Sequence, residues 1–390
     1  MTSYTTSLRL LRVEIVATNT LASISIMVPF YHSIGMDQSQ IGLSQALFTV
    51  ALLTLNIPTG WIADRFSRKF CNAFGDSGAA LGFIFYSQAH SFRDVIIAEI
   101  IIGISLAFSH GSDGALLYAY CQRFDSTGRR LRSENAMLTI YKPLAQIIVV
   151  LIGGAVAAVS PRTAILISAG PYVFGGILSL IIREDGERFV SIHRNPFRDM
   201  THLTMVSLRD ERLRWLIAAH AVGQKITHVM IWALTPLMLT AGVPLKIVAI
   251  GWALNAAMVA IGGVIARKWS MRLCEWKRFM WPNIVVLSAL SVMSIHLSLI
   301  TIWLYAGLGL AQGWLGSITM PMIQLHAPST TQASVGSLAG SVSQLLYIPL
   351  VWIVGLVGVL DIRLTMVATI LIFSPMVFIA SRRLYTLESK

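Results

Sequence analysis

Long apolar runs alternate with short polar segments over almost the whole chain. Each run is about 20 residues long, the length that an α-helix needs to cross the hydrocarbon core of a bilayer. The runs are continuous and show no apolar–polar alternation, so they predict helices and not the strands of a barrel. The pattern predicts twelve spans, at approximately 12–33, 40–61, 71–89, 95–119, 135–158, 162–182, 213–240, 245–266, 281–299, 301–325, 335–358 and 363–381.

The composition agrees with a membrane setting. The chain of 390 residues is 55% hydrophobic and 12% charged, and its mean hydropathy is +0.69. A soluble domain carries about 25% charged residues, so this chain has too few to cover a surface that faces water. The composition therefore predicts an all-α membrane protein whose outer wall faces the lipid bilayer.

Lysine and arginine residues gather on one side of the predicted spans. If the amino terminus is cytoplasmic, 24 of the 30 bases lie on the cytoplasmic side, and four lie opposite, at Arg93, Arg162, Lys246 and Arg363. This asymmetry predicts that both termini are cytoplasmic, in a multi-pass protein of the plasma membrane, which is the inner membrane in a bacterium. Topology and anionic lipid then account for the net charge of +12, so we expect no nucleic-acid partner.

Two features near the cytoplasmic face set further expectations. Glu14 lies within the first apolar run and no convincing cleavage site follows, so we expect a retained first helix and not a signal peptide. Cys71, Cys121 and Cys274 lack the spacing of metal ligands. We expect them to be free thiols in a reducing compartment, and we expect no metal site.

The predicted spans fall into two halves of six. The longest polar segment separates them, which predicts an N-terminal six-helix bundle at 1–182, a cytoplasmic linker at 183–212 and a C-terminal six-helix bundle at 213–390. The halves also share a motif, because GWIADRFSRK at 60–69 returns as GVIARKWSMR at 263–272. Parallel repeats of this kind are typical of secondary transporters.

The first copy of this motif resembles the loop between helices 2 and 3 of the major facilitator superfamily, usually written G-x-L-A-D-R-x-G-R-K. Ile62 stands where the family has leucine and Ser67 where it has glycine. The matching residues are Gly60, Ala63, Asp64, Arg65, Arg68 and Lys69. The resemblance covers essentially the full length of the chain and implies two six-helix bundles that transport a small molecule by alternating access.

The resemblance also implies a role for the loop. In the family this motif acts as a latch between the two halves that favours the outward-open state. Gly60 allows close helix approach, Asp64 offers its charge to a helix amino terminus, and the arginines form directional ion pairs. The alternative is that these bases only enforce topology. The second copy has Arg267 in place of the acid, so we expect the complete latch in the first half only.

A buried acid is expected to complete the latch. Asp113 lies in SHGSDGALLYAY, near the predicted cytoplasmic end of the fourth span, where an acid is costly unless it is paired. Its expected partners are Arg65 and Arg68. The alternative is that Asp113 carries a proton. Glu99, in the same span, is a second candidate for proton coupling. It could instead be a counter-charge for the substrate, or simply a residue close to the membrane interface.

A second group of polar residues suggests a substrate cavity. Lys225 lies about twelve residues into the seventh span, with Gln224 beside it and His228 one helical turn later. The resemblance places helices 1, 4, 7 and 10 around the central cavity, so Lys225 is a candidate substrate anchor, with a structural ion pair as the alternative. Trp232 and Trp314 are candidate cavity walls, although such residues more often lie in interfacial belts or in helix packing.

The remaining intramembrane charges suggest structural roles. Glu14, Asp76 and Lys142 lie towards the predicted cytoplasmic ends of their spans, where we expect partners that stabilise the bundle. His110 and His220, like His228, belong to no tight metal constellation.

The function predicted from these features is secondary transport driven by a proton gradient, without a cofactor. No P-loop, HExxH or serine-hydrolase elbow is present, although a membrane enzyme built on His110 and Asp113, or a sensor that does not transport, stays an alternative. Short loops and overall size favour a drug or metabolite exporter that acts as a monomer. The fifth span carries Pro143 but no GPxxGG, which weakens the assignment as an antiporter. The main alternative is an uptake symporter for a small, anionic metabolite anchored by Lys225.

Overall fold

The computed structural model describes residues 4–65, 67–125, 129–184, 209–326 and 332–389, and every element in this described part is a helix. The all-α prediction is therefore confirmed for these residues. Seven of the described helical segments are long and apolar enough to cross a membrane: Phe92–Phe124, Ser133–Ala157, Pro161–Ile181, Leu245–Trp269, Glu275–Ile295, Val335–Leu360 and Leu364–Glu388. Twelve spans and the location of the termini stay predictions.

The chain divides into two compact units. One comprises Met1–Met36 and Leu47–Pro196, and the other Asp37–Ala46 and Phe197–Lys390. The predicted linker at 183–212 lies largely outside the described residues, which omit 185–208.

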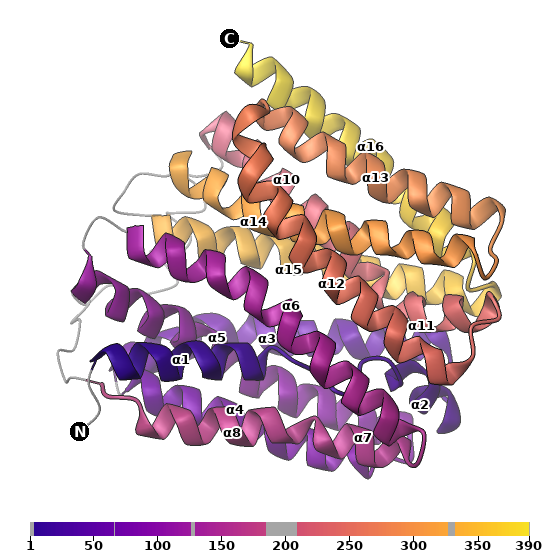
Figure 1. Cartoon of the computed structure of the whole chain (residues 1–390), viewed down its shortest axis with the longest axis horizontal. Helices are drawn as coiled ribbons and strands as arrows, with labels where there is room; N and C mark the ends of the chain where they lie inside the picture. The colour runs from indigo at the N-terminus through magenta and orange to yellow at the C-terminus, as the bar shows by residue number, and fades with distance from the viewer. Residues whose placement is uncertain (1–3, 66, 126–128, 185–208, 327–331, 390) are drawn as a thin grey trace. The chain divides into compact units, whose positions relative to one another are not determined.

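The first unit contains eight described helices, most of them visible in Figure 1. They are α1 (Tyr4–Thr18), α2 (Met27–Ser33), α3 (Gln38–Arg65, whose first residues belong to the second unit), α4 (Arg68–Ser87), α5 (Phe92–Phe124), α6 (Arg129–Ala157), α7 (Pro161–Ile167) and α8 (Ala169–Ile181). Helix α4 packs against both α5 and α8, and α1 packs against α8. Helix α4 thus has α5 and α8 as neighbours, and its buried polar side chains include Asn72, Asp76 and Ser87.

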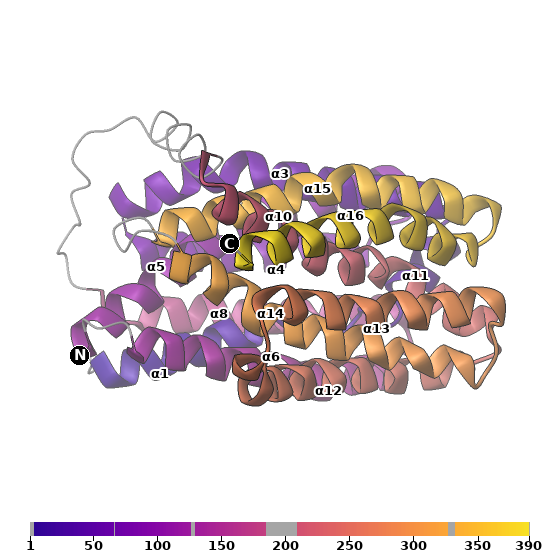
Figure 2. The same cartoon turned by 90° about the horizontal axis from the view of Figure 1, so that it is seen from above.

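The second unit follows a similar order of packing, and Figure 2 shows its helices α12, α13 and α14 side by side. Its elements are α10 (Glu211–Val229), α11 (Ile231–Thr240), α12 (Leu245–Trp269), η1 (Ser270–Arg272), α13 (Glu275–Ile295), η2 (Thr301–Tyr305), α14 (Ala306–His326), α15 (Gln332–Leu360) and α16 (Leu364–Glu388). The pairs α13–α16 and α10–α16 correspond to α4–α8 and α1–α8 in the first unit. The repeat seen in the sequence thus extends to helix packing.

Glycines set the closest approach between helices of the second unit. A Cβ atom added to Gly313 of α14 would lie 2.7 Å from the carbonyl carbon of Val259 of α12. One added to Gly262 of α12 would lie 2.9 Å from the carbonyl carbon of Leu310. Because neither backbone could tolerate these contacts, the α12–α14 pair requires glycine at both positions.

The first predicted span, 12–33, is not one continuous helix. Helix α1 ends at Thr18 and α2 begins at Met27. Asn19 Nδ2 donates to the Ile15 carbonyl at 2.8 Å, and Thr20 Oγ1 donates to the Ala17 carbonyl at 2.7 Å. Small polar side chains that bond backbone carbonyls in this way compete with the helical ladder, which explains why the helix stops here.

Side chains from elsewhere satisfy the backbone at this break. Gln146 of α6 accepts from the Leu21 N–H at 2.8 Å and donates to the Leu21 carbonyl at 3.0 Å. The Ser168 hydroxyl accepts from the Ser23 N–H at 3.1 Å. Non-helical backbone is tolerated at membrane depth only when its polar groups are bonded in this way. The break between α1 and α2 is therefore a stabilised feature of the first unit.

Candidate functional site

Three carboxyl groups meet inside the first unit. Glu14 of α1 and Asp76 of α4 are fully buried, and Asp113 of α5 is 7% exposed. The Glu14 carboxyl interacts with both of the other two. We call these three residues the carboxyl cluster. The sequence predicted Glu14 and Asp76 only as separate stabilising partners, so the cluster is a finding of the structure.

Neutral side chains and one base surround the cluster. Ser109 Oγ donates to Asp76 Oδ1 at 2.9 Å, and Asn72 Nδ2 donates to Asp113 Oδ1 at 2.7 Å. Lys142 of α6 interacts electrostatically with Asp113 and Glu14, while its Nζ donates to Asn19 Oδ1 at 3.1 Å. A single lysine faces three acids here, so the cluster carries excess negative charge whenever all three carboxyls are ionised.

Glu99 belongs to a different network in the same unit. It is 5% exposed on α5, and its Oε1 accepts hydrogen bonds from the Tyr86 hydroxyl at 2.9 Å and the Tyr31 hydroxyl at 3.4 Å. The two tyrosine hydroxyls also hydrogen bond to each other. Glu99 therefore joins α2, α4 and α5 and lies apart from the partners of Asp113.

The signature loop is described only in part. The side chains of Asp64 and Arg65, and the surroundings of Gly60, lie outside the described residues. Arg68 and Lys69 form the first turn of α4, which Ser67 caps by accepting from the Phe70 N–H at 3.3 Å. The predicted partnership of Asp113 with Arg65 and Arg68 stays a prediction, and the hydrogen bond described for the Asp113 carboxyl comes from Asn72.

Glu184 has a role at this loop that the sequence analysis missed. Its carboxylate accepts from the Ser67 hydroxyl, from the Arg68 N–H at 2.8 Å and from the Lys69 N–H at 3.4 Å. It thus places a negative charge at the amino terminus of α4, where the helix dipole favours an anion. Glu388, at the end of α16, accepts from the Glu275 N–H at 3.1 Å at the start of α13. The sequence does place an acid just after the last predicted span of each half, and this position could have indicated the role.

We expect Glu184→Gln to destabilise the first unit by about 1 kcal/mol, because an anion at a helix amino terminus contributes about that much. Thermal unfolding of the purified protein measures the effect. Glu388→Gln is the matched control, with a smaller expected loss because exposed Glu388 accepts a single N–H. Equal losses in the two variants would contradict a specific role for Glu184.

A cation lies in the interior of the second unit. Lys225 of α10 is 7% exposed, and its Nζ donates to Gln344 Oε1 of α15 at 3.1 Å. The same ammonium lies 4.8 Å from the ring centroid of Tyr347, in the range of a cation–π contact. Among the described residues, no carboxylate forms an ion pair with Lys225.

Aromatic side chains complete this arrangement. The His228 and Tyr347 rings meet edge to face with centroids 5.2 Å apart, and Trp232 Nε1 donates to the Tyr347 hydroxyl at 3.0 Å. We call Lys225, His228, Trp232, Gln344 and Tyr347 the Lys225 group. Gln344 and Tyr347 were absent from the sequence-based set, although a glutamine within an apolar span was a usable signal.

The other two candidates for the cavity lie outside the Lys225 group. Gln224 faces α14, with its Nε2 3.8 Å from the position that a Cβ of Gly316 would take. Trp314 Nε1 donates to the Arg278 carbonyl at 3.0 Å, which ties α14 to α13. The structure therefore gathers three of the five predicted residues around Tyr347.

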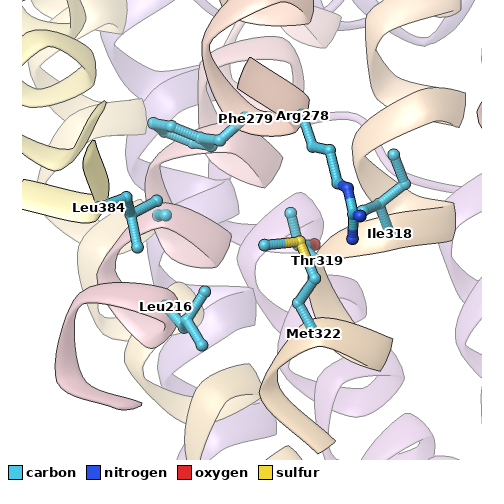
Figure 3. Close-up of a pocket in the computed structure, with 8 residues that line it drawn as sticks. Leu216, Arg278, Phe279, Ile318, Thr319, Met322 and Leu384 are labelled. Carbon is cyan, nitrogen blue, oxygen red and sulfur yellow. The ribbon is translucent and has the colours of Figure 1, made fainter. Parts of the chain in front are cut away.

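A small void lies beside Arg278 and Thr319 in the second unit. Its volume is about 10 Å³, which is space for a single water molecule and too little for a solute. Thr319, one of its lining residues, hydrogen bonds His220 Nδ1 at 2.7 Å. Figure 3 shows the lining side chains, which come from Leu216, Ala219, Arg278, Phe279, Ile318, Thr319, Met322 and Leu384.

A wider groove runs along the first unit between α1, α6 and α8. Its volume is about 650 Å³, within the range of sites for small organic molecules. Apolar and aromatic side chains such as Val16, Tyr141 and Phe174 line most of it, and Arg12 lies among them. Arg12 is paired with Glu134 at 2.8 Å, so the groove presents a mainly apolar wall.

Long apolar helices, a broken first span and charges buried in each unit define a multi-pass membrane protein of the transporter class. The sequence matches the family model described as Major Facilitator Superfamily over residues 13–350, and the chain belongs to this family. Comparison with curated proteins finds no match. The family and its structural neighbours point to a transporter and not to an enzyme.

Several solved transporters share the fold. The nucleoside transporter NupG matches with a TM-score of 0.77 at 10% identity, over 98% of this chain and 99% of that chain. A bacterial homolog of the human lysosomal transporter Spinster, inward-facing and unoccupied, matches with 0.72 at 15% identity, over 99% and 98%. A POT family transporter in complex with a thioalcohol-conjugated peptide matches with 0.69 at 13% identity, over 94% and 96%. The TM-scores establish a common fold, and identities this low establish no common substrate.

Proposed function

We propose that this protein is a proton-coupled secondary transporter that exports a small molecule by alternating access. The observation that carries the proposal is the unequal distribution of buried charge. The first unit holds the cluster of three buried carboxyls, besides buried Glu99 and Glu134, and the second holds a buried lysine without a carboxylate partner among the described residues. Such groups are costly inside a membrane protein and generally mark the paths of ions and substrates.

In this proposal the Lys225 group binds the substrate. An ammonium held by a neutral glutamine offers its charge to an incoming anionic group, and the Tyr347 and His228 rings offer a surface for an apolar or planar part. The broken span between α10 and α11 adjoins these residues, since α10 ends at Val229 and α11 begins at Ile231. Transporters of several folds bind substrates beside such discontinuous helices.

The orientation and the latch belong to the same proposal. Both termini are cytoplasmic, the protein lies in the inner membrane of a bacterium, and a monomer is the working unit. The loop of Gly60, Asp64, Arg65, Arg68 and Lys69 latches the two bundles, which the 183–212 segment connects. The strong asymmetry of lysine and arginine along the sequence supports this orientation.

A specific observation favours a second candidate. Because Lys225 has no ionised partner among the described residues, a substrate with a carboxylate or phosphate would supply one. The alternative is therefore an uptake symporter for a small anionic metabolite, which shares the proton site and differs only in direction.

Flux measurements in proteoliposomes test both candidates. We would use three labelled probes, a nucleoside, a dipeptide and lactate, and impose an inward or an outward proton gradient on the same vesicles. Export by antiport predicts accumulation of a probe when the interior is acidic, and symport predicts it when the exterior is acidic. Probe flux that is the same under both proton gradients would contradict proton coupling. Chemical conversion of a probe without flux would favour an enzyme.

A further inference from the structure

We propose that the carboxyl cluster of Glu14, Asp76 and Asp113 is the binding site of the transported proton, which Glu14 shares with the two aspartates. The proposal rests on the proposed function, since it names the site at which the coupling ion binds. It differs from the sequence-based candidates because it assigns the proton to the carboxyl cluster and not to Glu99, and because Glu14 and Asp76 gain a role in coupling.

Unsatisfied oxygen atoms carry the inference. Glu14 Oε2, Asp76 Oδ2 and Asn72 Oδ1 are buried, and none has a hydrogen-bond donor among the described residues. Asn72 is fully buried and its amide nitrogen already donates to Asp113 and to Ser179 Oγ. Three buried acceptors in one cluster need hydrogen-bond donors, because buried polar atoms are rarely left without partners.

A proton is the ligand that best fits the geometry. The Glu14 carboxyl interacts with both aspartate carboxyls, and two carboxyls form a hydrogen bond only when one of them is protonated. A proton on Glu14 turns an acceptor into a donor and supplies the missing bond. Within the described residues, no group of three or more His, Cys, Asp or Glu side chains is arranged to hold a metal ion.

Other charged and titratable groups lie around the cluster on each neighbouring helix. Lys142 of α6 interacts with Asp113 and Glu14, His110 of α5 interacts with Lys142, and Tyr172 of α8 interacts with Asp76. Lys142 is the cation among them. Its Nζ bonds Asn19, the first residue after α1, so the break in the first span and the charge nearest the cluster are connected.

This connection suggests how the proton leaves. When the segment between α1 and α2 rearranges during transport, the Lys142 ammonium leaves Asn19 and moves to the carboxyl cluster. There its positive charge stabilises the ionised carboxyls. The proton passes from the Glu14 carboxyl to water, which leaves a carboxylate and a hydronium ion. Gly175 of α8 leaves room for the Asp76 carboxyl, because a Cβ there would lie 2.8 Å from Asp76 Oδ2.

Infrared spectroscopy of the purified protein tests the site without any substrate. At neutral pH the wild type should show the carbonyl stretch of a protonated carboxyl, with the shift in heavy water that identifies an exchangeable proton. Glu14→Gln and Asp76→Asn should each remove about half of this band or more. Glu134→Gln, whose carboxylate is ion-paired with Arg12 and Arg130, should leave the band unchanged.

Three spectroscopic outcomes would overturn the proposal. The first is a wild type without such a band, and the second is a band of equal size in folded Glu14→Gln and Asp76→Asn. The third is loss of the wild-type band on replacing choline chloride by sodium chloride, which would make the cluster a sodium site.

A flux measurement distinguishes failure of the proton site from failure of the proposed function. Glu14→Gln should abolish accumulation of a probe driven by a proton gradient but retain probe exchange. Normal accumulation in that variant would reduce the cluster to a structural role, whereas a wild type without gradient-driven flux would contradict proton coupling itself.

Discussion

Replacing Gly153 by alanine is expected to disrupt the first unit at the break in its first span. A Cβ atom at position 153 of α6 would overlap the Ala22 carbonyl oxygen and lie 2.6 Å from the carbonyl carbon. Backbone atoms cannot turn away as a flexible side chain can, so α6 and the segment after α1 must separate. Overpacking of this kind costs about 1–3 kcal/mol. The two hydrogen bonds between Gln146 and Leu21 would weaken with it.

Thermal unfolding and gradient-driven flux measure this effect together. The expected result is a lower unfolding temperature and little or no transport. Gly170→Ala in α8 is the matched control, because a Cβ there meets nothing within 4 Å. It should be neutral, or more stable by up to about 1 kcal/mol from helix propensity. A Gly153→Ala protein with wild-type stability and flux would show that the close approach at Ala22 is dispensable.

Removing the charge of Lys225 is expected to give the largest loss of substrate binding. Hydrogen bonds to charged groups contribute about 1.5–3 kcal/mol, so Lys225→Ala should weaken binding of an anionic probe about 10- to 100-fold. Lys225→Arg should retain part of the affinity because it keeps the charge and changes the geometry of its donors. Equilibrium binding of the probe that the wild type transports gives these values directly.

Driven flux distinguishes anchoring from proton handling at Lys225. If Lys225 belongs to the proton pathway, Lys225→Ala should spare binding, abolish gradient-driven accumulation and leave exchange intact. Lys246→Ala, at an exposed position in the first turn of α12, controls for loss of one positive charge from the protein. Normal binding and normal driven flux in Lys225→Ala would mean that Lys225 is a tolerated structural charge.

The helices could be predicted from the sequence because an apolar run of about 20 residues has few other stable forms in a bilayer. The break after Thr18 could not. Its causes are local bonds from Asn19 and Thr20, but its support comes from Gln146 and Ser168, more than 120 residues away. Hydrophobicity alone carries no information on such partners.

The same limit applies to the candidate sites, where neighbours along one helix could be predicted and partners from other helices could not. His228 could be placed beside Lys225 because both lie on one helical face, three residues apart. Gln344 lies 119 residues away and reaches Lys225 only through the packing of α10 against α15. Likewise Glu14, Asp76 and Asp113 each stand out as acids in apolar spans, yet only the packing of α1, α4 and α5 unites them.

Proton movement across the vesicle membrane tests the central claim most directly. The protein would be reconstituted with a pH-sensitive dye inside, at equal pH on both sides, and a gradient of the transported probe would be the only driving force. The account predicts that the probe, moving down its gradient, drives protons across the membrane in the opposite direction, and that Glu14→Gln abolishes this movement while probe exchange continues. Probe flux in the wild type without any change in internal pH would contradict the account.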